Sequence, residues 1–153
     1  MAELTLLLFL FIFAASASIF SAQVQQCDYA MVIHTGPTRG PTYKLRVLIE
    51  AKGGGNINTT NLVKNWGDMG RKYTYFLPNT KDRFKYQGPC MKGNFCNIIL
   101  GGGSKKELNP HWYVHNISIT TKGEGIDRVR TFIIFSGNEI DYLNPPLNDG
   151  DCP

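Results

Sequence analysis

Apolar and polar residues alternate with a period of two along several segments of this chain. The clearest case is Tyr43–Glu50, in which every second residue is apolar and the residues between them are mostly charged. Such alternation indicates a β-strand with one buried face. The same reasoning predicts further strands at Cys27–His34, Asn97–Leu100, Trp112–Thr120 and Arg128–Phe135. In Trp112–Thr120 we expect one face to carry Tyr113, His115, Ile117 and Ile119.

The segments between these strands are rich in Gly, Pro and Asn, and no stretch shows the periodicity of an amphipathic helix. This pattern predicts an all-β protein built as an antiparallel β-sandwich. The glycine runs Gly53–Gly55 and Gly101–Gly103 are expected to be connecting loops. Neither belongs to a GxxxxGK[ST] motif, so neither is expected to bind phosphate.

The segment Leu62–Phe84 concentrates large aromatic residues beside Gly67 and Gly70. Glycines that break a helix next to aromatics suit a wide loop that leads into a strand, and we expect Tyr73 and Tyr75 on one face of that strand.

This pattern, Leu-x3-Trp-Gly-x-Met-Gly-x2-Tyr-x-Tyr-Phe-x5-Asp-x-Phe, resembles the plant stress-associated group of PLAT (lipoxygenase/alpha-toxin) domains. The match continues through Gly88-Pro89-Cys90, Cys96, His111–Val114 and Cys152, so it covers most of the chain. The resemblance implies an eight-stranded antiparallel β-sandwich. Since a fold hosts many functions, the function has to be argued from sites.

The head of the chain reads as an export signal. Leu4–Phe20 is apolar apart from Thr and Ser, and small residues follow it. We therefore expect residues 1–22 to be a signal peptide, cleaved between positions 17 and 22, and residues 23–153 to form a single domain. The alternative is an uncleaved anchor, because the apolar stretch reaches the lower end of a membrane-spanning length. The expected location is outside the cell or in the lumen of the endoplasmic reticulum.

All four cysteines follow the predicted signal, which favours disulfides over metal ligation. Four cysteines allow three connectivities, and the sequence alone cannot choose among them. Because domain termini often lie close together, we predict Cys27–Cys152, with Cys90–Cys96 closing a short loop.

Basic residues are concentrated in the first part of the domain. Tyr29–Lys106 contains 13 Lys or Arg against three acids, whereas the segment from Glu107 to the end contains seven acids against three bases. A basic patch would favour anionic partners such as phospholipid head groups or acidic wall polysaccharide. Export argues against nucleic acid, and we expect a monomer.

Two N-glycosylation sequons are present, at Asn58 and Asn116. Asn58 is expected in a loop after the triple glycine. Asn116 is expected within a strand, facing outward if Ile117 faces the core.

Catalytic signatures are missing from the sequence. The cysteines are assigned to disulfides, no GxSxG elbow occurs, and the strands that would hold paired carboxylates contain almost no acids. We therefore predict no enzymatic activity and no catalytic residue.

The resemblance also indicates where a calcium site would lie. Many PLAT domains carry a Thr-Asp-Ala/Ser segment at the start of the second strand, but Gly40–Lys44 contains no carboxylate here. Ala51 stands where relatives often place an acid, although Glu50 is adjacent. Because calcium prefers several oxygen ligands, usually including carboxylates, we expect no such site near Thr42 and Tyr43, and no other cofactor.

What remains is a binding module. PLAT domains are regarded as lipid- or protein-binding, and aromatic and basic residues together favour membrane interfaces. The sequence places one such group in a single loop, comprising Trp66, Met69, Arg71, Lys72 and Tyr73. A competing interpretation is that Trp66, Tyr75 and Phe76 fill the core. The alternative function is that of a wall- or protein-interacting factor with no lipid affinity, and the resemblance further implies a role in plant stress responses.

Overall fold

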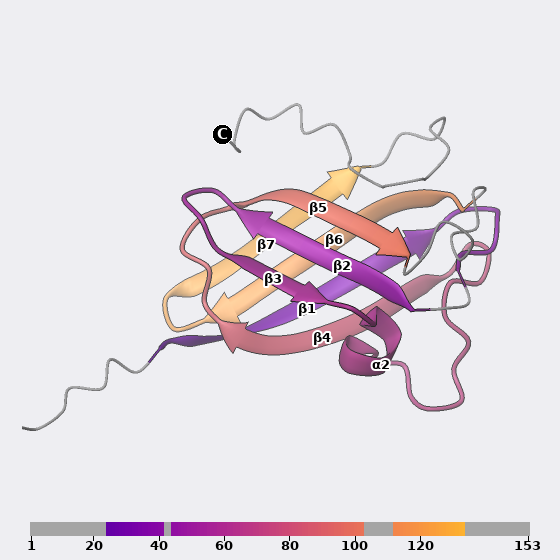
Figure 1. The fold of residues 1–153 in the computed structure, drawn as a ribbon, viewed down its shortest axis with the longest axis horizontal. Helices are drawn as coiled ribbons and strands as arrows, with labels where there is room; N and C mark the ends of the chain where they lie inside the picture. The colour runs from indigo at the N-terminus through magenta and orange to yellow at the C-terminus, as the bar shows by residue number, and fades with distance from the viewer. Residues whose placement is uncertain (1–23, 42–43, 103–111, 134–153) are drawn as a thin grey trace, which may run out of the picture.

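The computed structural model describes residues 24–41, 44–102 and 112–133. Within them lie seven strands in two antiparallel sheets and one short helix (Figure 1). In chain order the elements are β1 (Gln26–Thr35), β2 (Leu45–Ala51), β3 (Asn56–Thr59), α2 (Leu62–Trp66), β4 (Lys81–Pro89), β5 (Phe95–Gly102), β6 (Val114–Gly123) and β7 (Ile126–Ile133). The predicted antiparallel all-β architecture is thus confirmed, as a four-stranded and a three-stranded sheet consistent with a sandwich.

The larger sheet has the order β4-β1-β6-β7, and the smaller has the order β3-β2-β5. The two sheets face each other (Figure 1). The core between them is made of the strand residues that point inward, which are mostly every second residue of each strand. The fully buried members include Ile33, Leu45, Val47, Ile49, Phe84, Ile98, Leu100, Ile117 and Ile119. This alternation is what hydrophobic burial requires of a strand with one covered face.

Three strand predictions agree closely with the structure, and three segments differ. β1, β2 and β7 follow the predicted segments, although residues 134 and 135 lie outside the described part of the chain. β5 is longer than expected, since Gly101 and Gly102 continue the strand opposite Arg46 and Leu45 instead of starting a loop. β3 was expected to be a loop, and no strand was assigned to residues 81–89, where β4 lies. The strand expected to carry Tyr73 and Tyr75 is absent, because both residues lie in the loop before β4.

The predicted faces of β6 are wrong in its first half. Trp112 and Val114 are buried while Tyr113 and His115 are exposed, yet Ile117 and Ile119 are buried as well. The cause is an irregularity in the pairing with β1, where Thr35 is opposite Val114 but His34 is opposite Asn116. His115 is the extra residue of a β-bulge, and a single inserted residue moves every later side chain to the other face.

The disulfide assignment is also corrected by the structure. Cys27 at the start of β1 is bonded to Cys90, just after β4, with a Cα–Cα distance of 4.9 Å. The predicted pairs Cys27–Cys152 and Cys90–Cys96 are therefore wrong. Cys96 is disulfide-bonded too, and Cys152 lies outside the described residues. The bonded state indicates an oxidising compartment.

The physical reason for this pairing is the sheet itself. β1 and β4 are adjacent antiparallel strands, and Cys27 is opposite Gly88, two residues before Cys90. A Cβ at Gly123 of β6 would collide with the Cys27 Sγ. The absence of a side chain at Gly123 therefore leaves space for the sulfur.

Residues 1–23, which contain the predicted signal segment, lie outside the described residues. Within the part of the chain that is described, no helix has the length and apolar character needed to cross a membrane.

Candidate functional site

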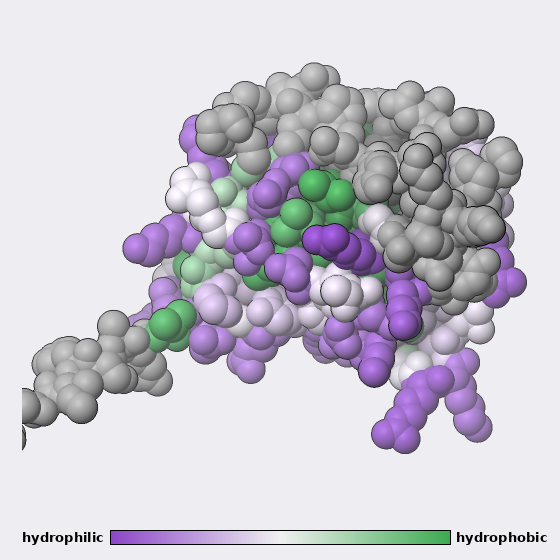
Figure 2. All heavy atoms as spheres, viewed as in Figure 1, coloured by the Kyte–Doolittle hydropathy of each residue, from purple (hydrophilic) through white to green (hydrophobic). Residues whose placement is uncertain are grey.

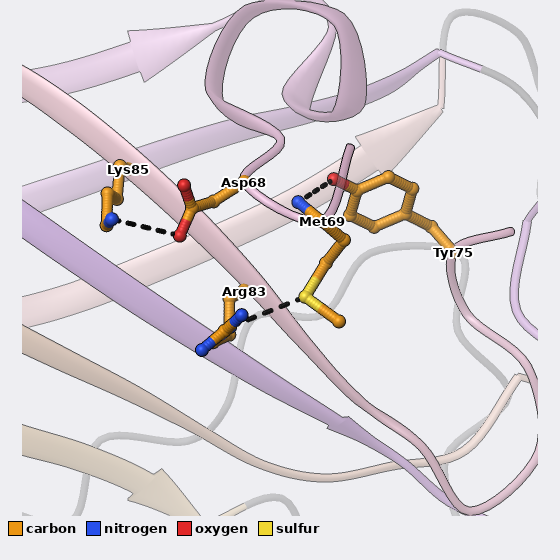
Figure 3. Close-up of polar contacts among 5 residues, drawn as sticks. All are labelled: Asp68, Met69, Tyr75, Arg83 and Lys85. Carbon is orange, nitrogen blue, oxygen red and sulfur yellow. Dashed lines mark hydrogen bonds and ion pairs between the residues drawn. The ribbon is translucent and has the colours of Figure 1, made fainter. Parts of the chain in front are cut away.

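The loop between α2 and β4 is held against the edge of the larger sheet. Gly67 forms a bridge with Phe84, and the Asp68 N–H donates to the Arg83 carbonyl at 3.1 Å. The Lys85 ammonium pairs with the Asp68 carboxylate at 3.1 Å (Figure 3). The start of the loop therefore acts as a short additional strand along β4.

Trp66 is not exposed in this loop. It closes α2, is 7% exposed, and its ring packs on Tyr86 with centroids 4.9 Å apart. The helix begins because the Asn61 side chain accepts from the Lys64 N–H at 3.1 Å, and it ends at Gly67. This capped turn directs Trp66 into the core, as the competing interpretation had it.

Met69 also turns toward the protein. Its N–H donates to the Tyr75 hydroxyl at 2.9 Å, and its Sδ accepts from the Arg83 Nε at 3.4 Å (Figure 3). Tyr75 is partly buried against the core and Phe76 is 1% exposed. Two more aromatics of the loop therefore serve packing.

Arg71 and Lys72 differ from Tyr73 in how far they are exposed to solvent. Arg71 and Lys72 are exposed in a turn that follows Gly70, and hydrophilic side chains project from this part of the molecule at the lower right of Figure 2. Tyr73 is half-buried, with its ring edge-on to Tyr75 at 5.0 Å between centroids. Of the five residues predicted to form a binding loop, only the two basic ones extend fully into solvent.

The exposed bases of the turn continue onto β4. The outward residues of this strand alternate with buried ones and include Lys81, Arg83 and Lys85. We call Arg71, Lys72, Lys81, Arg83 and Lys85 the basic surface. The loop pairs directly with β4, so these residues lie on adjoining segments.

A second feature, which the sequence did not reveal, is an open cleft of about 480 Å³ beside α2. Its described walls come from Arg39, Pro41 and Lys44, from Asn61 and the start of α2, and from residues 73–76. Three of the lining side chains are basic, namely Arg39, Lys44 and Lys64. None of the described lining residues is an acid, a histidine or a cysteine. These bases are distant in sequence, so no local motif could have grouped them.

The floor of the cleft is fixed by an unusual backbone conformation at Phe76. This residue has a φ of 59°, which is uncommon for a residue other than glycine. Its N–H donates to the Asp82 Oδ2 at 3.0 Å, and its carbonyl accepts from the Gly40 N–H at 2.8 Å. A Cβ at Gly40 would collide with Phe76 and Trp112, which shows how closely the two walls approach.

Asp82 is the buried acid behind this floor. It is 0% exposed, and burial raises the pKa of its carboxyl, although hydrogen bonds from the Phe76 N–H and the Tyr73 hydroxyl act in the opposite direction. The carboxyl thus holds Phe76, which lines the cleft, from inside the protein.

Potential metal ligands are sparse. No three His, Cys, Asp or Glu side chains of the described residues come together. His34 and His115 have ring centroids 4.8 Å apart, and burial, His115 and Lys81 together lower the pKa of His34. Thr42 and Tyr43, where a family-type calcium site was not expected, lie outside the described residues.

Both sequons are described. Asn58 is exposed on β3, an edge strand rather than the predicted loop. Asn116 is partly exposed on β6, beside fully buried Ile117, so the expected outward orientation is confirmed.

Comparisons of the chain with models of known protein families and with curated proteins gave no match.

Proposed function

We propose that this chain is an exported, non-enzymatic binding module of the PLAT type, and that its basic surface associates with anionic membranes. The proposal includes the eighth strand that the resemblance implies, a secreted or endoplasmic-reticulum location, and a role in plant stress responses. The observation that carries the binding proposal is the exposure of Arg71 and Lys72 beside the outward bases of β4.

The electrostatics of the basic surface favour an anionic partner. Asp68 and Asp82 are the acids nearest in sequence, but Asp68 is paired with Lys85 and Asp82 is buried. The remaining bases attract an anionic lipid surface over about a Debye length, roughly 10 Å at moderate ionic strength.

The mode of association follows from the buried aromatics. With Trp66 in the core and Met69 turned to Arg83, the loop contributes charge rather than an inserted anchor. Association through charge alone is reversible and sensitive to salt.

The experiment is sedimentation with vesicles of phosphatidylcholine containing about one-third phosphatidylserine. We expect the wild type to sediment at low salt and to be released as salt rises. Because each base near such a surface contributes roughly fivefold in affinity, the variant Arg71→Ala/Lys72→Ala should bind roughly thirtyfold more weakly.

The matched control is Lys92→Ala/Lys122→Ala, which removes two exposed bases at the opposite end of the sandwich. It should bind nearly as well as the wild type. Equal losses in both variants would show that only net charge matters. A wild type that ignores these vesicles at low salt would refute lipid binding, and the wall- or protein-interacting alternative would take its place.

A further inference from the structure

We propose that the cleft beside α2 binds acidic sugars, specifically uronic-acid residues of an anionic polysaccharide. The cleft is distinct from the basic surface, because neither Arg71 nor Lys72 is among its lining residues. The proposal therefore does not depend on membrane binding.

The size of the cleft selects a small organic ligand over an isolated ion. Ligand sites in proteins typically enclose roughly 300–1,000 Å³, and this cleft encloses about 480 Å³. That volume accommodates one or two sugar rings.

The charges in the cleft select an anion. Arg39 comes from the segment after β1, Lys44 precedes β2, and Lys64 lies in the first turn of α2. Bases from three segments line the opening, and none of the described lining residues is an acid. Carboxylates are among the groups that such ammonium and guanidinium donors bind most strongly.

The uncharged lining residues favour a sugar over a lipid. Tyr73 and Tyr75 supply aromatic rings, on which the C–H faces of a sugar can stack, and Asn61 and Thr74 supply polar groups for its hydroxyls. The Asn61 oxygen already caps α2, so the group that Asn61 offers a ligand is its NH₂ donor. Among the described lining residues, the aliphatic and Phe side chains are those of Pro41, Val63 and Phe76, which is a small apolar surface for an acyl chain.

The rings are also held in place before a ligand arrives. The Tyr75 hydroxyl accepts from the Met69 N–H, and its ring stacks on Phe84 with centroids 5.2 Å apart. The Tyr73 ring lies edge-on to the Tyr75 ring with centroids 5.0 Å apart. A site whose side chains are already fixed loses less conformational entropy on binding.

The test is calorimetric titration of the full chain with trigalacturonate, alongside the methyl ester of the same trisaccharide. We expect saturable binding of the acid form and at least about tenfold weaker binding of the ester, since charge-assisted hydrogen bonds are lost. Lys44→Ala/Lys64→Ala should weaken binding of the acid form by about tenfold or more.

The matched variant is Arg71→Ala/Lys72→Ala, which removes the same charge from outside the cleft and should change trigalacturonate affinity less than about twofold. Circular dichroism of each variant verifies that it is folded.

Three results would overturn the proposal. They are equal affinity for the acid and its ester, equal losses in the two double variants, and absence of saturable binding by the folded wild type. Competition by inorganic phosphate at equal concentration would identify a general anion site instead. Vesicle sedimentation that depends on Lys44 and Lys64, without trigalacturonate binding, would assign the cleft to a lipid head group.

Discussion

The two ends of the sandwich are built in different ways. At one end, where β1 begins and β4 finishes, the Cys27–Cys90 bond joins the strands covalently. Toward the other end, α2 and the loop that follows it lie beside the larger sheet (Figure 1). Residues of both line the open cleft.

Polar groups at the two ends also serve different purposes. Beside the disulfide, the Tyr29 hydroxyl donates to the Pro89 carbonyl at 2.7 Å and accepts from the Met91 N–H at 3.0 Å, so its bonds satisfy the backbone on both sides of Cys90. Beside the cleft, buried Asp82 holds Phe76 in a left-handed conformation. The comparison suggests that stability is concentrated at the closed end and recognition at the open one.

The largest effect should come from breaking the closed end. Cys27→Ala/Cys90→Ala removes a cross-link between residues 63 positions apart, which on the chain-entropy model lowers the free energy of unfolding by about 4 kcal/mol. Urea unfolding under non-reducing conditions measures this. An unchanged unfolding free energy, or peptide mapping that joins Cys27 to another cysteine, would contradict the assignment.

A smaller loss is expected from Tyr29→Phe. The variant keeps the ring but leaves the Pro89 carbonyl and the Met91 N–H without their partner, at a cost of about 2 kcal/mol. Tyr113→Phe, at an exposed position, is the control and should unfold like the wild type. If the two variants have the same stability, the hydroxyl at Tyr29 is not a structural element of this end.

The smallest effect on the free energy of unfolding is expected at the open end, where replacing Asp82 should stabilise the protein instead of destabilising it. Burial raises the pKa of Asp82 above its ordinary value, so the folded state holds the proton more tightly than the unfolded state does. The stabilisation that the folded state gains from the protonated Asp82 carboxyl is therefore complete below about pH 4. It is lost as the pH rises through the folded-state pKa.

Asp82→Asn retains an oxygen for the Phe76 N–H and carries no charge. It should match the unfolding free energy of the wild type near pH 4 and exceed it near pH 7. Urea unfolding at both values is the measurement. Parallel pH profiles would show that the Asp82 carboxyl is not destabilised by burial.

The sequence predicted the fold where burial alone sets the pattern. β2 could be recognised because Leu45, Val47 and Ile49 all point into the core. β4 could not be recognised, because its inward positions include Asp82 and Gly88 beside Phe84. Its residues therefore do not alternate between apolar and polar. The faces of β6 were mistaken because a bulge at His115 leaves no mark in composition.

The candidate site was less predictable than the fold. Arg71 and Lys72 are adjacent in the chain, so the sequence could group them, and both are exposed. Whether Trp66 faced solvent or core depended on Tyr86 of β4. The disulfide was predicted incorrectly because proximity of the chain termini does not specify that β1 and β4 are neighbouring strands. Gly88 and Gly123, which both lie beside Cys27, were the available signal.

The edge position of β4 has a consequence for self-association. An open sheet edge presents unpaired backbone groups on which a second copy of the chain could add a strand, and lysine along such an edge is a common protection. Here Gly67 and Asp68 occupy the middle of the edge, while Lys81 and Lys85 flank it. We therefore expect the charges that we assign to ligand attraction also to oppose pairing of β4 with a second copy, and an acidic polymer that neutralised them to weaken this barrier to aggregation.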